Sequence, residues 1–458
     1  MADVRARMKH ACLRASLMVR VCAMGVMLCA GDVAMAAGSD GMPAPVSHLP
    51  LAEAIGQGLN QERVKALNQF LQDQVDQGFP GGQLVVLRAG SVVLNQAFGY
   101  KRLWNELDRL PAPEPTGSDV LYDMASNTKI YATVLALMHL VYQGKVEVDA
   151  PVSRYIAGFA DAPQDAVKGK NTLTLRHLLA HNAGFLADPR YYDPKDPRVG
   201  EALYSQERSL TLQKLLKTPL VKPPGTRHVY SDVDFLLLGM VIENVTGQPL
   251  DAYVESTFYK PLGLHHVMFN PMAKGMAPDR TAATERLGNT RDGTITFPRV
   301  RTHTIQGQVH DEKSFYSMGG VSGHAGLFGP AREVAVLAQL FLGAGRLGER
   351  TFFTQKELDL FTTPAPGDAS YGLGWRLNLG ATPSWFSPRS SPKAYGHTGW
   401  TGIVTVIDPA YELAIVLFTN KKHSPVVNPK ENSNRFLGDA LPLGQYGPLV
   451  DAVYAALE

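Results

Sequence analysis

Cysteine is nearly absent from this chain of 458 residues. The sequence has three cysteines, Cys12, Cys22 and Cys29, and all of them precede Ala30. The chain beyond Cys29 therefore has no thiol for a disulfide or for a cysteine nucleophile. We expect its folded part to be held together by its hydrophobic core alone.

An excess of one charge sign is also absent. The 44 lysines and arginines nearly balance the 42 aspartates and glutamates, and the formal net charge is +2. So small an excess gives no basic patch for a phosphate backbone, and we expect no nucleic-acid partner. Hydrophobic residues make up 45% and charged residues 19%. This composition is typical of a globular chain with one large core or two intermingled cores.

The N-terminal leader lacks an apolar run long enough for an ordinary membrane span. Five basic residues, Arg5 to Arg20, precede the run "VCAMGVMLCA", and the small residues "AMAA" follow at 34–37. This order predicts a signal peptide over residues 1–36 and export to the periplasm. An uncleaved inner-membrane anchor stays open, although a span needs about twenty apolar residues and Asp32 interrupts the run. Residues 37–50, with their Gly, Pro and Ser content, predict a linker.

Strand signals lie at both ends of the remaining chain, residues 51–458. A helical stripe (Val64, Leu67, Phe70, Leu71 and Val75) predicts a helix that stops at Gly78. Two apolar runs around Arg88 to Gly90 predict a hairpin, and those at 371–379, 396–408 and 412–420 predict an antiparallel meander. A final helix is expected from residue 447. The middle, roughly 126–342, is mostly helical runs and loops, so the terminal segments are expected to enclose a helical lobe beside a cleft.

One chemical pattern opens this middle region. Ser126 and Lys129 stand three residues apart at the start of an apolar helix with the core stripe Val134, Leu137, Met138 and Val141. At this spacing the amine reaches the hydroxyl, and a desolvated lysine can accept the serine proton. The pattern is weak alone, since it occurs about once by chance in such a chain, and it recurs at Ser390 and Lys393. The alternative is a helix-capping serine with a snorkelling lysine.

Two further motifs follow in order along the chain. Tyr230-Ser231-Asp232 precedes a second apolar helix, and His397-Thr398-Gly399 lies on one of the predicted strands. The order S-x-x-K, Y-x-N/D and H/K-T-G, with each motif in its expected structural context, is much less likely to be accidental than any single motif.

With these motifs the chain resembles the serine β-lactamase and penicillin-binding protein superfamily, in its class C-like branch with D-alanyl-D-alanine carboxypeptidases and related esterases. The segments 175–185, 222–235 and 317–328 share in the resemblance, which covers nearly the whole chain after the leader. It implies an α/β (α+β) fold of the β-lactamase/transpeptidase type. In this fold an antiparallel sheet flanked by terminal helices lies next to an all-helical lobe, with the site between them.

The resemblance also implies roles for individual residues. Ser126 is the expected nucleophile, Lys129 helps to deprotonate it, and Tyr230 carries a proton to the leaving group. The backbone N–H groups of Ser126 and Trp400 are expected to form the oxyanion hole. The expected substrate-binding residues are Asp232, His397, Thr398, Gly399 and Trp400.

Two of these positions depart from the usual pattern. Asp232 stands where relatives most often have asparagine, and an ionised carboxylate there would raise the pKa of Lys129. Trp400 stands where relatives that bind a substrate carboxylate often have serine or threonine, so its side chain narrows the pocket or stacks on substrate. The reaction class is therefore better supported than the substrate.

The expected function is that of an exported serine hydrolase acting through an acyl-enzyme. Its first expected substrate is a D-Ala-D-Ala peptide of peptidoglycan, with β-lactams as covalent ligands, and an esterase or a β-lactamase is the alternative within the superfamily. The alternative that is not an enzyme is a non-catalytic family member that binds peptidoglycan or a partner. Such a binding module would not need Ser126, Lys129 and Tyr230 together.

No cofactor and no metal are expected from the sequence. His310-Asp311-Glu312 and His265-His266 are adjacent residues that lack the spacing of a chelating helix or hairpin. His177 and His181, in "HLLAHNAGF", are expected to be scaffold residues.

Overall fold

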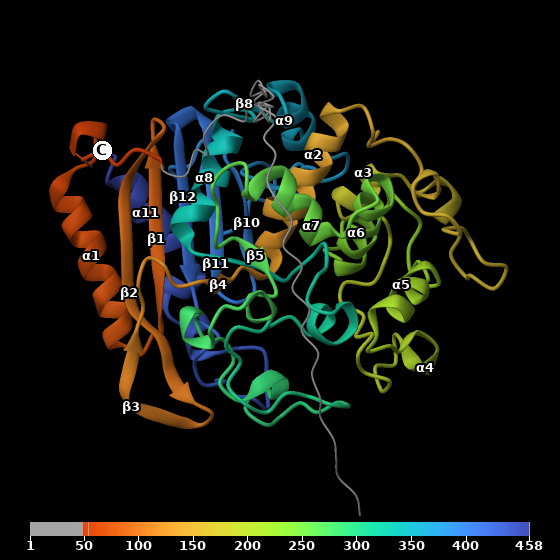
Figure 1. Ribbon diagram of the computed structural model, residues 1–458, viewed down its shortest axis with the longest axis horizontal. Coiled ribbons are helices and arrows are strands. Elements are labelled where there is room, and N and C mark those ends of the chain that lie inside the picture. Colours follow the sequence, from red (N-terminus) through yellow and green to blue (C-terminus); the bar gives the residue numbers. More distant parts are fainter. Residues whose placement is uncertain (1–48, 54, 458) are drawn as a thin grey trace, which may run out of the picture. The chain divides into compact units, whose positions relative to one another are not determined.

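The computed structural model describes residues 49–53 and 55–457 (Figure 1). The predicted signal peptide or anchor, residues 1–36, lies outside this range, as does nearly all of the predicted linker. In the described part of the chain, no helix combines the length and the apolar character needed to cross a bilayer. The leader and its cleavage therefore stay predictions.

A seven-stranded antiparallel sheet forms one layer of the molecule (Figure 1). In spatial order its strands are β3 (Asp108–Pro115), β2 (Ser91–Asn105), β1 (Gly81–Arg88), β12 (Leu413–Thr419), β11 (Ile403–Asp408), β10 (Tyr395–Gly399) and β9 (Arg376–Leu377). The first and last strands of the chain meet at its centre, where β1 pairs with β12. The N-terminal and C-terminal segments thus build one sheet, as the sequence predicts.

The predicted hairpin and meander are confirmed with one difference. β1 and β2 are joined at Ala89 and Gly90, which both have positive φ, and β10, β11 and β12 follow one another as antiparallel neighbours. In the run 371–379, however, only Arg376–Leu377 forms a strand. Gly374 there has a φ of +81°, and this left-handed conformation interrupts an extended strand.

Both faces of the sheet are covered, which explains its continuous apolar strands. Along β12 the odd-numbered residues from Leu413 to Leu417 pack in the core beneath α1 (Gln61–Asp76) and α11 (Gly447–Ala455). The even-numbered residues from Ala414 to Phe418 pack in the core on the opposite face. There α8 (Ala331–Leu342) lies against β1, β11 and β12. The two predicted terminal helices, α1 and α11, are confirmed.

The remaining helices form a second layer around α6 (Figure 1). They are α2 (Leu135–Tyr142), α3 (Leu175–Leu179), α4 (Gly200–Leu203), α5 (Arg208–Leu216), α6 (Asp232–Thr246), α7 (Leu250–Val254) and α9 (Gln355–Thr362). α10 (Leu437–Ala440) precedes the last helix. The residues of α8 fall within the range 126–342 expected for the helical lobe, but α8 packs on the sheet, whereas α9 packs on α2.

Short strands complete the structure. β4 (Tyr122–Asp123), β6 (Leu327–Gly329) and β5 (Met268–Phe269) form a small antiparallel sheet, and β7 (Arg346–Leu347) pairs with β8 (Arg350–Thr351). β4 leads directly into the segment that contains Ser126. The small sheet therefore fixes the point at which that segment begins.

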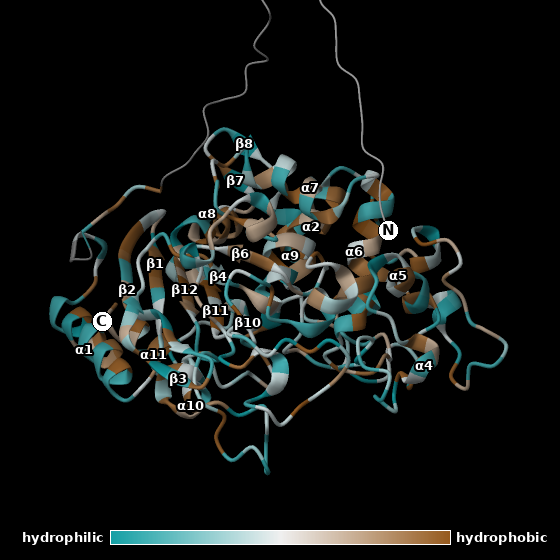
Figure 2. Cartoon of the chain, turned by 60° about the horizontal axis from the view of Figure 1, so that its bottom comes forward, coloured by the Kyte–Doolittle hydropathy of each residue, from teal (hydrophilic) through white to brown (hydrophobic). Residues whose placement is uncertain are grey.

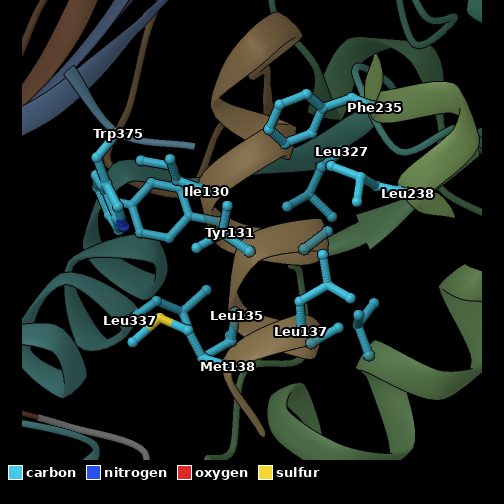
Figure 3. Packing of buried hydrophobic residues seen from close by; sticks show 14 of the residues in the cluster. Ile130, Tyr131, Leu135, Leu137, Met138, Phe235, Leu238, Leu327, Leu337 and Trp375 are labelled. Carbon is cyan, nitrogen blue, oxygen red and sulfur yellow. The ribbon is translucent and has the colours of Figure 1, made fainter. Parts of the chain in front are cut away.

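The helical segment after Ser126 is buried on all sides. Ile130, Tyr131, Leu135 and Met138 are fully buried and contact residues of both layers, including Trp375 and Phe235 (Figure 3). In Figure 2 the central strands are mostly brown, whereas α1 at the surface carries a large share of teal. A helix that is apolar all round belongs in the core of a protein. Val134, Leu137 and Met138 of the predicted stripe are confirmed as core residues, whereas Val141 is only partly buried.

Candidate active site

Ser126 lies in a tight turn, residues 124–127, which we call the serine turn. The Asp123 carboxylate accepts a hydrogen bond from Ala125 N at 2.8 Å, and Ala125 has a φ of +44°. A 3₁₀ turn, Ala125–Asn127, is followed by a π-helical segment, Lys129–Val134, and then by α2. The sequence predicts a plain helix here. Wider turns of this kind occur often at functional sites, and this one presents Ser126 at the start of a buried helix.

Lys129 is fully buried beneath the serine turn. Its ammonium donates to Ser126 Oγ at 3.0 Å, to Asp232 Oδ1 at 2.9 Å and to the His324 carbonyl at 3.4 Å. The side chain is 0% exposed. A snorkelling lysine would hold its ammonium in water, so the geometry favours the interpretation in which Lys129 acts on the Ser126 hydroxyl.

The start of α6 carries the second motif. The Ser231 hydroxyl caps this helix by accepting from Val233 N at 3.3 Å, a common role for serine. The cap places Tyr230 just before the helix and Asp232 at its first residue. The Tyr230 ring centroid is 4.6 Å from Lys129 Nζ, and the phenol lies close enough to the side chains of Lys129 and Ser126 to interact with both.

The third motif lies on β10, at the edge of the sheet that faces the serine turn. His397 O accepts from Asn127 Nδ2 at 3.4 Å, and a Cβ added to Gly399 would come within 2.6 Å of the Met124 carbonyl oxygen. Only glycine permits so close an approach. In the described part of the chain β9 pairs with β10 only at Tyr395 and Gly396, so this end of β10 is not covered by β9.

A cavity of about 530 Å³ lies over these groups. The predicted residues that line it are Ser126, Tyr230, Asp232, His397, Thr398, Gly399 and Trp400. Lys129 lies directly behind Ser126. The structure therefore brings together all eight predicted site residues, Lys129 included, from segments far apart in the sequence.

The charges at the site differ from those of a simple buried base. Burial lowers the pKa of Lys129, but Asp232 and Tyr230 outweigh burial and raise that pKa above its ordinary value. Burial raises the pKa of Asp232, but the charges of Lys129 and Lys313 hold it well below its usual range. Burial also lowers the pKa of His397 to about 3. At neutral pH Asp232 is thus ionised, Lys129 is protonated and His397 is neutral.

Trp400 lies on one wall of the cavity, and the residue is 40% exposed. Its indole N–H donates to His310 Nε2 at 3.3 Å, and the Lys422 ammonium lies 3.7 Å from the ring centroid. Lys422 is itself fixed by Asp439 at 2.6 Å. Contacts of this kind stabilise one ring orientation, so Trp400 is a preorganised apolar surface beside Ser126.

Several residues at the site were missed in the sequence. Lys313 binds the second oxygen of Asp232 at 3.1 Å, and His324 Nε2 donates to Asp311 Oδ1 at 2.8 Å. Asp311 and Lys313 belong to the stretch "HDEK" at 310–313, to which the sequence motifs assign no catalytic or binding role, and both residues line the cavity.

The acidic groups near Lys129 do not suggest a metal centre. Ligand atoms of Asp232, Asp311 and His324 lie within 4.8 Å of one another. Both oxygens of Asp232, however, already bind the ammonium groups of Lys129 and Lys313. A divalent cation there would face two positive charges at close range, so we assign these residues to the lysine network.

Comparison with known proteins identifies sequence relatives along most of the chain. A family model described as "Beta-lactamase" matches residues 65–440. A protein of Escherichia coli O157:H7 named "Putative D-alanyl-D-alanine carboxypeptidase" is 50% identical over 402 residues, which cover 88% of this chain and 92% of that protein. A protein of the same name from Salmonella typhimurium is 49% identical over 403 residues, with the same coverage.

Solved structures confirm the predicted fold class. A penicillin-binding protein homologue from Caulobacter crescentus has 22% identity and a TM-score of 0.61, covering 87% of this chain and 99% of its own. EstCE1, a hydrolase with promiscuous acyltransferase activity, has 23% identity and a TM-score of 0.63, covering 87% of this chain and 100% of its own. With the family model and the close relatives in agreement, the chain belongs to the β-lactamase/transpeptidase family.

Proposed function

We propose that this protein is an exported serine hydrolase that forms an acyl-enzyme on Ser126 and acts as a D-alanyl-D-alanine carboxypeptidase on peptidoglycan stem peptides. The observation that carries the proposal is the contact of 3.0 Å between Lys129 Nζ and Ser126 Oγ at the floor of the cavity. The names of relatives at 49–50% identity support the substrate class. A binding module has no need of a hydroxyl held against a buried amine.

In the proposed reaction Ser126 Oγ attacks the carbonyl carbon of the terminal peptide bond. Its proton passes to Lys129 once that lysine is neutral. Tyr230, which lies beside both side chains, gives its phenol proton to the departing amine of D-alanine and recovers a proton from the Lys129 ammonium. Water then hydrolyses the ester and restores the Ser126 hydroxyl. Splitting one difficult displacement into two acyl transfers is the usual benefit of covalent catalysis.

The developing negative charge on the carbonyl oxygen is assigned to the backbone N–H groups of Ser126 and Trp400. The close approach of Gly399 to the Met124 carbonyl supports this assignment, because it holds the end of β10 against the serine turn. Preorganised donors of this kind usually supply a large part of the rate enhancement.

An esterase is the second candidate, and the exposed ring of Trp400 favours it. This ring replaces a hydroxyl that could bind a substrate carboxylate, and the Lys422 ammonium over the ring is already bound by Asp439. An apolar acyl or leaving group would gain by stacking on such a surface. Hydrolysis of a β-lactam requires the same acyl-enzyme and differs only in the rate of its breakdown.

Three substrates separate these candidates. The purified protein would be incubated with a fluorescent penicillin, with D-Ala-D-Ala peptides and with short-chain nitrophenyl esters. A carboxypeptidase releases D-alanine and retains the penicilloyl label, an esterase is fastest on the esters, and a β-lactamase loses the label rapidly. No label and no turnover with any substrate would contradict the proposed enzyme and favour a binding protein.

Export is tested at the N-terminus. The basic leader, the short apolar run and "AMAA" predict a periplasmic protein whose chain begins near Ala37. N-terminal sequencing of protein recovered from the periplasm measures this directly. An intact leader in the membrane fraction would instead show that residues 1–36 are a tether.

Replacement of Asp232 by asparagine is expected to shift the pH profile of acylation toward lower pH. The Asp232 carboxylate, 2.9 Å from Lys129 Nζ, holds the proton on the lysine, and its removal lowers the pKa of Lys129 by about 1–3 units. The measurement is the rate of penicillin acylation from pH 5 to 10, roughly the range in which such groups titrate. An unshifted profile would show that Asp232 does not control the lysine proton.

A further inference from the structure

Asp232 bridges two buried lysines. Its Oδ1 binds Lys129 Nζ at 2.9 Å, and its Oδ2 binds Lys313 Nζ at 3.1 Å. The Lys313 side chain is 6% exposed and also binds the Asp188 carboxylate at the mouth of the cavity. Asp232 thus joins two ammonium groups, of which Lys129 is the one that contacts Ser126.

Three of the other titratable groups near Lys129, namely His181, Tyr230 and His397, are neutral at neutral pH. Burial holds the pKa of His181 and His397 below neutrality and raises the pKa of Tyr230 and Asp234. The groups facing the two lysines are Tyr230, Asp232 and Asp234 at the start of α6, His181 after α3, Asp311 and His324 before β6, His397 on β10, and Asp188 and Tyr192 beside Lys313. The charge balance of Lys129 therefore depends chiefly on Asp232 and its second partner.

We propose that Lys313 is a positioning residue for the reaction, which sets the pH range in which Lys129 can accept the Ser126 proton. By binding the far oxygen of Asp232, Lys313 opposes the attraction of that carboxylate for the proton on Lys129. The proposal rests on the proposed function, because Lys129 needs to be neutral only if it deprotonates Ser126.

Two other roles for Lys313 fit the geometry less well. An anion-binding residue needs a free ammonium in the cavity, whereas Lys313 already binds two carboxylates and is almost fully buried. A purely structural residue would stabilise the loop without affecting a proton. A structural role would not require Lys313 to bind the second oxygen of the same carboxylate that binds Lys129.

The test is the pH profile of penicillin acylation in Lys313→Met. Without this positive charge, Asp232 attracts the proton on Lys129 more strongly and the pKa of Lys129 rises. The acid limb of the profile, where the rate increases as Lys129 loses its proton, should therefore move to higher pH by about one unit. Asp232→Asn moves it in the opposite direction, and the shifts should offset each other in the double variant. Lys313→Arg keeps the charge and should retain a profile close to that of the wild type.

Asp188→Asn is a second variant that does not disturb the core, because the Asp188 side chain is 51% exposed. Without this carboxylate the Lys313 charge acts more fully on Asp232, and the acid limb should move to lower pH. Lys170→Met is the matched control, since Lys170 is a buried lysine with a carboxylate partner, Asp165, at 3.8 Å. Lys170 does not line the cavity, so its loss should leave the profile unchanged.

The outcomes separate this inference from the proposed function. Suppose that the wild-type protein is acylated on Ser126, but folded Lys313→Met has an unmoved pH profile or one shifted to lower pH. This result overturns the role of Lys313 and leaves the proposed function standing. If Lys313→Met does not fold, an unmoved profile in Asp188→Asn overturns it in the same way. A wild-type protein that is never acylated at Ser126 overturns both.

Discussion

Replacement of Ser126 by alanine is expected to abolish covalent labelling by penicillin and to reduce turnover by several orders of magnitude. The hydroxyl in the serine turn contacts the buried Lys129 ammonium, and no other group in the proposed mechanism forms the acyl bond. Intact-mass measurement of the wild type should show one penicilloyl adduct, and peptide mapping should place it on Ser126. Persistent labelling of Ser126→Ala would contradict the assignment.

Ser390→Ala provides the matched control, because Ser390 and Lys393 repeat the S-x-x-K pattern. The Ser390 hydroxyl accepts from Ser387 N at 3.2 Å in a loop, and Lys393 is exposed to solvent. Lys393 is thus not buried against the Ser390 hydroxyl as Lys129 is against Ser126, so this pair lacks the arrangement that would activate a nucleophile. Labelling of Ser390→Ala should equal that of the wild type.

Lys129→Arg is expected to reduce acylation by several orders of magnitude while the fold persists. Arginine retains the positive charge beside Asp232, but it cannot give up its proton within the accessible pH range. The measurement is the second-order rate constant of acylation, with thermal unfolding as the check on folding. Lys129→Met is the companion variant, because it removes the base without adding volume to a fully buried site.

A wild-type acylation rate in folded Lys129→Arg would show that Lys129 is a structural residue and that the mechanism is wrong. An intermediate result is informative as well. If Lys129→Arg is inactive and Lys129→Met retains weak activity that rises with pH, Tyr230 can act as a slower base, because its phenol contacts Ser126. Its pKa is raised by burial, so that activity should appear only at high pH.

The sheet and its terminal helices followed from patterns that are local in sequence. The turn at Ala89 and Gly90 separates two apolar runs, and the meander from β10 to β12 contains turns of a few residues. Short connections between apolar strands allow few alternatives to antiparallel pairing. The short β9 was not predictable in this way, because it depends on the backbone angle of one glycine, Gly374.

The residues proposed for the chemistry were also accessible from the sequence, because Ser126 and Lys129 are one helical turn apart. The order of the three motifs, two of them at the start of buried helices and the third on a strand, was sufficient to identify the candidate residues. The structure places these residues around one cavity. The contacts of His310 and Lys313 at the site were not predicted, because each residue acts through a partner distant in sequence.

The sequence by itself determined the family, the order of the elements and the candidate nucleophile with its amine, all of which depend on residue type at short spacing. Only the tertiary structure decided the protonation of the site. Asp232 and Lys129 are 103 residues apart in the chain and 2.9 Å apart in space, and Lys313 reaches the same carboxylate from a third segment. A pKa depends on the distances between charges and on their burial, and the packing of the two layers sets both.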